Sequence, residues 1–128
     1  MVTSVTNFGR SGLSDWLVQR VSGVILLAYT VFIAVVLLVC APDFVEWKAL
    51  FDQTWVKVFS LAAVLSVASH AWIGLWSVST DYLVPYVLTV KLGPAVGAKA
   101  NILRWCFQAA SAIVLFTYVV WGIQILWG

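Results

Sequence analysis

Three long apolar runs, separated by shorter segments that carry the charges, dominate the pattern of this sequence. Residues 21–40, 58–80 and 105–128 contain no Asp, Glu, Lys or Arg. Each run reaches the roughly 20 residues that a helix needs to cross a bilayer. Backbone groups in lipid must be hydrogen-bonded within the segment, so runs of this kind span as helices. The pattern predicts an all-α integral membrane protein with three transmembrane helices, at about 18–40, 56–80 and 103–127.

The segments around these runs indicate one membrane-anchor domain, residues 1–128, without a repeat or linker. The N-terminal segment 1–17 carries polar and charged residues before the first run and has no A-x-A cleavage site, so it does not resemble a signal peptide. We expect it to lie on the membrane surface. Ser14 or Asp15 is predicted to cap the first helix there, with Arg20 at the membrane boundary.

Composition and charge agree with a membrane setting. Hydrophobic residues make up 63% of the chain and charged residues 9%, against about 25% charged in soluble domains. The net charge of +2 is too small to indicate a nucleic-acid partner. Five of the seven Lys and Arg residues lie before the first span or between the second and third. This asymmetry predicts a cytoplasmic N-terminus and a C-terminus on the opposite, periplasmic side.

His70 is the single histidine, and it lies near the middle of the second apolar run. A polar side chain at that depth is costly and is usually kept for a reason. One interpretation is a structural hydrogen bond to a serine of a neighbouring helix. The other is a ligand to haem iron, since an imidazole nitrogen coordinates iron and surrounding helices provide a dry pocket. No second histidine or C-x-x-C spacing indicates another metal site.

Small and polar residues share one face of the second helix with His70. They follow helical spacing and are Ser66, His70, Gly74, Ser77 and Asp81. Such a stripe leaves room for a flat macrocycle, although small residues also serve ordinary helix packing. One histidine supplies one axial ligand. A haem held by two histidines would therefore need a second polypeptide or a second copy of this chain.

Asp81 and Tyr82 lie about 16 Å beyond His70 along the helix axis, at 1.5 Å per residue. A tyrosine hydroxyl there could donate a hydrogen bond to a quinone carbonyl, with the carboxylate supporting the network. The alternative is an ordinary interfacial tyrosine beside a helix-ending aspartate. Arg20 could approach haem propionates or Asp81, or simply extend to the lipid headgroups.

The sequence resembles one known family in three places. These are the segments "GRSGLSDWLVQRVSGVILLAY" and "SHAWIGLWSVSTDYLVP", and a third span that ends in "WG". The family is that of the small hydrophobic membrane anchor of bacterial succinate dehydrogenase, which is respiratory complex II. The resemblance implies that His70 is an axial ligand of the iron of haem b. It also implies that Arg20 lies near the haem propionates and that Tyr82, with Asp81, contributes to the ubiquinone site. Gly74 and Ser66 would then line the haem pocket.

The same resemblance implies partners and a location. Succinate oxidation, a step of the tricarboxylic acid cycle, belongs to a flavoprotein subunit, and electrons reach quinone through an iron–sulfur subunit. The second haem histidine comes from a sister cytochrome b subunit. This chain would then have no catalytic residues and would lie in the lipid of the bacterial inner membrane.

Two features of the sequence differ from the sister subunit or from the family pattern. The S-x-x-H-R motif of the sister subunit is absent, because the matching place reads "LVQRVSG", and the loop at 83–102 is longer than the family pattern suggests. Two alternatives stay open at this point. One is the related fumarate reductase anchor, and the other is a small structural membrane protein or transporter without a cofactor.

Overall fold

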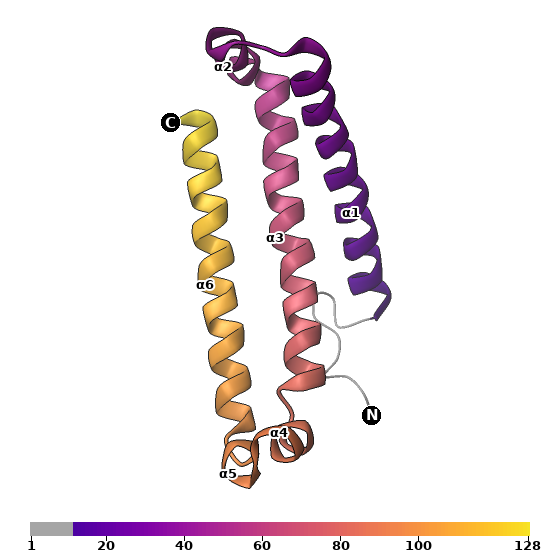
Figure 1. The fold of residues 1–128 in the computed structure, drawn as a ribbon, viewed down its shortest axis with the longest axis vertical. Helices are drawn as coiled ribbons and strands as arrows, with labels where there is room; N and C mark the ends of the chain where they lie inside the picture. The colour runs from indigo at the N-terminus through magenta and orange to yellow at the C-terminus, as the bar shows by residue number, and fades with distance from the viewer. Residues whose placement is uncertain (1–11) are drawn as a thin grey trace.

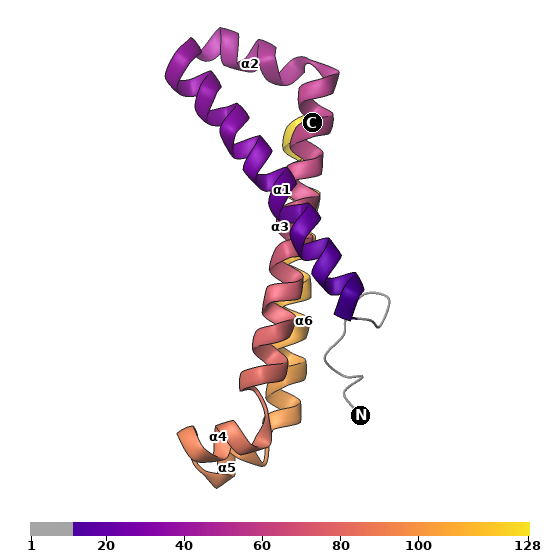
Figure 2. The ribbon, with the colours of Figure 1, turned by 90° about the vertical axis from the view of Figure 1, so that its right-hand side faces the viewer.

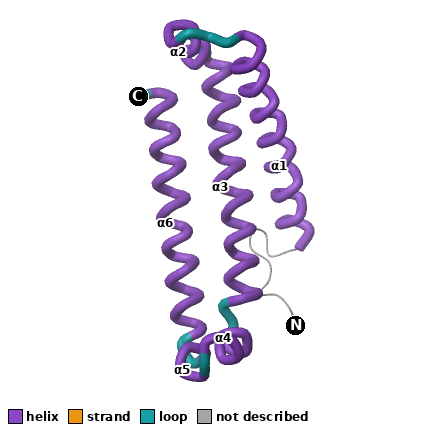
Figure 3. Tube along the Cα trace, in the orientation of Figure 1, coloured by secondary structure: helices purple, strands orange, loops and turns teal. Residues whose placement is uncertain are grey.

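The computed structural model describes residues 12–128, which are almost entirely helical and include no strand. Three long helices run up and down (Figure 1). They are α1 (Gly12–Val35), extended by the π-helical turn η3 (Val36–Cys40), then α3 (Thr54–Tyr82) and α6 (Ala100–Trp127). Three short helices occupy the connections, leaving little loop (Figure 3): α2 (Phe44–Asp52), α4 (Pro85–Leu92) and α5 (Pro94–Gly97).

The long helices match the predicted class of protein. Within residues 12–128, three stretches are long and apolar enough to cross a membrane, namely Gly12–Cys40, Thr54–Tyr82 and Ala100–Trp127. A helix of 29 residues is roughly 44 Å long at 1.5 Å per residue, whereas the hydrocarbon core is about 30 Å thick. The helices begin before the predicted spans, and α3 also ends two residues after its predicted span. The prediction of an all-α membrane protein with three spans is confirmed.

The start of α1 differs from the expectation. Helix α1 already includes Gly12, so Ser14 and Asp15 lie in its first turn. The prediction that one of them is the N-cap is wrong, because the helix begins before either residue. The carboxylate of Asp15 still favours the helix here, since the N-terminal end of a helix dipole attracts negative charge. Residues 1–11 of the predicted surface segment lie outside the described residues.

The three long helices form a single layer with α3 in the centre. Helix α1 packs on one side of α3 and α6 on the other (Figure 1). In the view turned by 90°, α1 crosses α3 at a slant while α6 runs alongside it (Figure 2). The start of α1 lies toward the end that carries α4 and α5, and α2 lies at the opposite end with the C-terminus (Figure 1). The slanted crossing places the middle of α1 against the middle of α3.

The interior is small and contains serines. The buried polar side chains among the described residues are Ser22, Ser60, Ser66 and Ser79. Large apolar side chains are instead exposed along the outer helices, with Leu38 83% and Phe116 71% exposed. Lipid tails are as apolar as these side chains, so helix contacts in membranes use small residues that let backbones approach closely. The distribution is that of a helical layer surrounded by lipid or partner helices.

The segment 83–102, expected as a long loop, contains two short helices, α4 and α5, and the first residues of α6. Pro85 and Pro94 occupy the first turns of α4 and α5, where a missing N–H is tolerated. Gly93 between them adopts a φ of 101°, a conformation that favours glycine. A Cβ on Gly97 would clash with the Thr89 side chain, so α5 folds closely against α4. The connection therefore presents a defined surface.

Candidate functional site

His70 lies on α3 at the place where α1 crosses it. Its Nδ1 atom is 3.2 Å from Oγ of Ser22 on α1. Ser22 is 4% exposed, and its hydroxyl also donates a 3.1 Å hydrogen bond to the backbone carbonyl of Gln19. The structure thus contains the serine contact that was one interpretation of His70. That contact occupies one ring nitrogen, and within residues 12–128 no hydrogen-bond partner is found for the other, Nε2.

His70 also lines a groove between α1 and α3, with a volume of about 570 Å³. We call it the His70 groove. Seven of its lining residues come from α1 and three from α3: Asp15, Trp16, Gln19, Arg20, Gly23, Val24, Leu27, His70, Ile73 and Ser77. It combines an imidazole, a guanidinium and a carboxylate with apolar walls. A small number of polar groups on a mainly apolar wall is typical of cofactor and small-molecule sites.

Arg20 shares this groove with His70, although the two residues lie on different helices. Its guanidinium carbon is 5.6 Å from the centroid of the Trp16 ring, within the range of a cation–π contact. The Arg20 side chain is exposed, so its charge is not committed to a buried ion pair. The α1 side of the groove therefore presents a positive charge that is available to an anionic group.

Space beside the imidazole comes from Gly23. A Cβ at this position would lie 4.0 Å from Cε1 of His70, the carbon between the two ring nitrogens. Gln19, one turn before Gly23, has a buried side-chain oxygen, Oε1, with no hydrogen-bond partner among the described residues. The sequence interpretation missed both residues. The one feature of the sequence that links Gln19 and Gly23 is that they are four residues apart, which places them on the same face of α1.

The predicted stripe on α3 is only partly brought together. Ser77 lines the His70 groove, and its hydroxyl donates a 3.0 Å hydrogen bond to the Ile73 carbonyl. Gly74 lies between them in sequence, with nothing within 4 Å of an added Cβ. Ser66 is buried and lines a different hollow between α1 and α3, which shares no residue with the His70 groove. Ser66 therefore lies outside the groove that contains His70.

Asp81 and Tyr82 lie at the end of α3, and neither lines the His70 groove. Asp81 is exposed, and 63% of Tyr82 is exposed. Pro85 begins α4 three residues after Tyr82, so both residues stand at the end of the layer that carries α4 and α5 (Figure 1). The pair is thus separate from the groove but lies toward the same end of the molecule as the start of α1.

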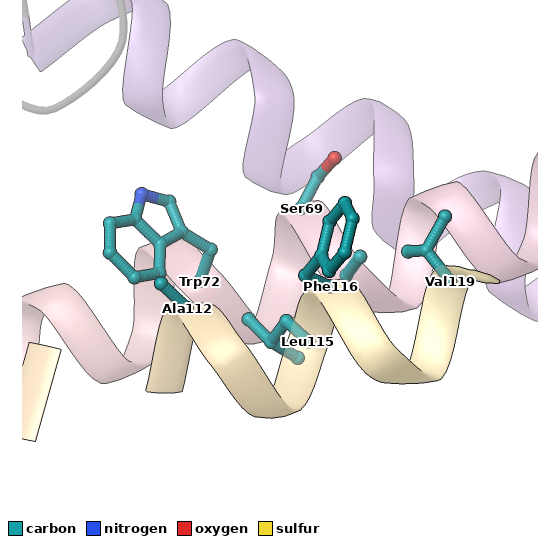
Figure 4. A pocket seen from close by; sticks show the side chains of 7 residues that line it. Ser69, Trp72, Ala112, Leu115, Phe116 and Val119 are labelled. Atoms are coloured by element: carbon teal, nitrogen blue, oxygen red, sulfur yellow. The ribbon is translucent and has the colours of Figure 1, made fainter. Parts of the chain in front are cut away.

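Trp72 of the H-A-W-x-G-x-W segment lies in another groove, between α3 and α6 (Figure 4). This groove has a volume of about 360 Å³, and its lining residues are Ala68, Ser69, Trp72, Ala112, Leu115, Phe116 and Val119. Two residues along an α-helix differ in direction by roughly 200°, since one turn takes 3.6 residues. His70 and Trp72 therefore serve different contacts of α3 although they are close in sequence.

Two hydrogen bonds between the long helices were not anticipated. Tyr29 on α1 and Ser60 on α3 are joined at 2.8 Å between their hydroxyl oxygens. Gln108 on α6 donates through Nε2 to Oγ of Ser79 on α3, also at 2.8 Å. The signal in the sequence was a polar side chain inside an apolar run. These contacts join α3 to both neighbours and hold the layer around the groove.

Within residues 12–128, no group of three or more His, Cys, Asp or Glu side chains could hold a metal ion by itself. A metal bound at His70 would therefore need further ligands from a macrocycle or from another chain. A porphyrin shared between two polypeptides would supply ligands from both of these sources.

Comparison with known proteins identifies the family of the chain. Residues 4–96 match the family described as succinate dehydrogenase/fumarate reductase transmembrane subunit. The succinate dehydrogenase hydrophobic membrane anchor subunit of Coxiella burnetii (strain RSA 493 / Nine Mile phase I) is 34% identical over 124 residues, covering 96% of this chain and 95% of that protein. The resemblance noted in the sequence is thus confirmed. The chain belongs to the family of succinate dehydrogenase and fumarate reductase transmembrane subunits.

Proposed function

We propose that this multi-pass membrane protein is the hydrophobic anchor of a succinate dehydrogenase and forms half of a haem b site. His70 would be one axial ligand, and a sister cytochrome b subunit would supply the other. The observation that carries the proposal is the His70 groove, which the single histidine lines from α3 and Arg20 lines from α1. Family membership supports the same assignment.

The residues that line the groove, together with Ser22 behind the imidazole ring, have the chemistry that a haem would need. Ser22 lies against Nδ1 of His70, which leaves Nε2 to face a ligand. Gly23 leaves the space beside the ring free of side-chain atoms. Arg20 offers a guanidinium that can bind a propionate through charge-assisted hydrogen bonds. When bound, haem b would supply a site for one-electron transfer, with a potential set by its ligands and their surroundings.

Tyr82 and Asp81 are proposed to contribute to a ubiquinone site at the end of α3. The exposed Tyr82 hydroxyl is free to donate a hydrogen bond to a quinone carbonyl, and Asp81 would hold the network or deliver a proton. Their separation from the His70 groove supports two sites and not one shared pocket. Partner subunits would cover both side chains in the assembled complex.

The flavoprotein and iron–sulfur subunits would bind at the end that carries α4 and α5. Lys91 lies in α4, Lys99 directly precedes α6, Arg104 lies near the start of α6 and Tyr82 ends α3. Arg20 lies in the first half of α1, which starts toward this end (Figure 1). An excess of Lys and Arg marks the cytoplasmic side of a membrane protein, so the N-terminus would face the cytoplasm. The chain would lie in the bacterial inner membrane. Electrons would then reach the quinone on the side where the iron–sulfur subunit binds.

The fumarate reductase anchor is the second candidate, because the family that matches residues 4–96 includes both enzymes. The two anchors support opposite directions of the same reaction. The midpoint potential of the bound haem, or its absence, would separate them. A structural membrane protein or transporter without a cofactor would purify alone and colourless.

The test is a His70→Ala variant in the purified complex, with co-purifying chains identified by mass. We expect the haem b bands of the reduced-minus-oxidised spectrum to be lost or strongly reduced, because the iron would keep a single protein ligand. Ser69→Ala is the matched control, since Ser69 is adjacent in sequence but lines other grooves. An unchanged haem spectrum in His70→Ala would refute the ligand assignment.

A further inference from the structure

The contact between Ser22 and His70 has a preferred direction, because Ser22 also contacts a backbone carbonyl. A serine hydroxyl has one proton to donate and lone pairs with which to accept. Ser22 donates that proton to the Gln19 carbonyl at 3.1 Å. Its Oγ atom, 3.2 Å from Nδ1 of His70, is therefore left to accept a hydrogen bond from the ring. In this arrangement the Nδ1 atom carries the imidazole proton; in the alternative one, Ser22 would donate to Nδ1 and leave the Gln19 carbonyl unbonded.

The arrangement that satisfies both contacts of Ser22 favours one tautomer of His70. In a neutral imidazole one nitrogen carries the proton and the other carries the lone pair. With the proton on Nδ1, the lone pair belongs to Nε2. Ser22 is 4% exposed, so water does not compete for the bond. The ring is thus prepared to coordinate a metal through the nitrogen that has no partner among the described residues.

We propose that Ser22 is a positioning residue for His70, which sets the tautomer and the orientation of the ring toward haem iron. The inference rests on the proposed haem function and adds a role for a residue on a different helix. Metal-ligating histidines commonly donate their second ring N–H to a nearby acceptor, which orients the ring and makes it a better ligand. Here the acceptor is a serine that is itself oriented by the backbone of α1.

Ser22 has a simpler role as a small residue at a helix crossing. Alanine satisfies that role equally well, because it is slightly smaller and lacks the hydroxyl. Threonine keeps the hydroxyl and adds one methyl group. The two substitutions therefore separate the hydrogen bond from the packing, since packing alone predicts a silent Ser22→Ala.

The experiment compares Ser22→Ala, Ser22→Thr and His70→Ala in the intact purified complex. Ser69→Ala serves as the control, because the Ser69 hydroxyl bonds to the Leu65 carbonyl of its own helix. Three quantities are measured: the midpoint potential of the haem, the low-spin ferric EPR signal, and the rate of haem transfer to excess apomyoglobin.

Losing the partner of a metal-bound histidine typically lowers metal affinity roughly 10-fold to 100-fold. We expect Ser22→Ala to transfer haem faster by about the same factor. Its midpoint potential should rise, because a ring without its acceptor is a weaker donor to ferric iron. Ser22→Thr should restore both quantities toward the unsubstituted complex. Ser69→Ala should change neither.

The outcomes separate this inference from the function on which it rests. If His70→Ala loses haem but Ser22→Ala matches the unsubstituted complex in all three measurements, Ser22 does not position the ring. If His70→Ala keeps its haem spectrum, the proposed function itself is wrong. Should Ser22→Ala fail to assemble, Ser22→Cys takes its place, since a thiol is nearly isosteric but a weak acceptor. An unchanged potential in Ser22→Cys then overturns the inference.

Discussion

Gln108 on α6 and Ser79 on α3 are joined by a 2.8 Å hydrogen bond, from Nε2 of the amide to Oγ of the serine. Ser79 is completely buried, and its own hydroxyl proton is donated to the Trp76 carbonyl at 2.7 Å. The serine thus accepts and donates at once, so Gln108 has a fixed acceptor. In a membrane such a hydrogen bond holds α6 against α3 at one defined position along the two helices.

The two residues of this bond should therefore differ in how much their removal destabilises the complex. Ser79→Ala leaves the Gln108 amide without its acceptor in an apolar setting, which should destabilise the complex by about 1–2 kcal/mol. Gln108→Leu leaves Ser79 bonded to Trp76 and should cost less. The double variant should be more stable than the sum of the two effects predicts. The temperature at which the chain dissociates from the complex measures each effect, and simple additivity would argue against the bond.

Gly23 allows a direct test of the space beside His70. Alanine there would place its Cβ 4.0 Å from Cε1 of His70, an ordinary contact, so Gly23→Ala should keep its haem. Gly23→Leu would fill the groove and should lose most of the haem while the complex still assembles. Ala68→Leu adds bulk to the groove between α3 and α6 and is the matched control. Equal haem content in both leucine variants would place the cofactor elsewhere.

Tyr82→Phe should lower quinone reductase activity about tenfold, since one lost hydrogen bond is worth roughly 1–1.5 kcal/mol. Succinate oxidation with an artificial acceptor that takes electrons upstream should be unaffected. Tyr86→Phe is the control, because Tyr86 is an exposed tyrosine four residues further on, in α4. A parallel decrease in both assays would indicate damage to assembly, and no decrease in either would remove Tyr82 from the quinone site.

Orientation can be tested with single cysteines after Cys40 and Cys106, both free and exposed, are replaced. Ala98→Cys reports on the connection that holds α4 and α5, and Ala49→Cys reports on α2. Asp43 is avoided because its carboxylate caps α2, accepting a 2.8 Å hydrogen bond from the Glu46 N–H. In intact cells an impermeant thiol reagent should label position 49 and not position 98. The reverse pattern would overturn the orientation that the Lys and Arg asymmetry predicts.

The sequence by itself determined the class of protein, its three spans and its family. The spans follow from the length of uncharged apolar runs, which is a local property and needs no knowledge of neighbouring helices. His70 was recognisable as a candidate ligand for a similar reason, since a single histidine among apolar residues stands out in any arrangement. The start of α1 was mispredicted because Ser14 and Asp15 are good capping residues that here lie inside the first turn.

Only the tertiary structure decided which residues surround His70. Three helices that are apolar on all sides carry little periodic signal of which face meets which neighbour. The slanted crossing of α1 over α3 brought Ser22 to Nδ1 of His70 and Gly23 beside the ring, and it left Ser66 lining a different hollow. The contact between Ser22 and His70 joins residues 48 positions apart in the sequence. Such contacts depend on the angle between two packed helices, which the pattern within either helix does not specify.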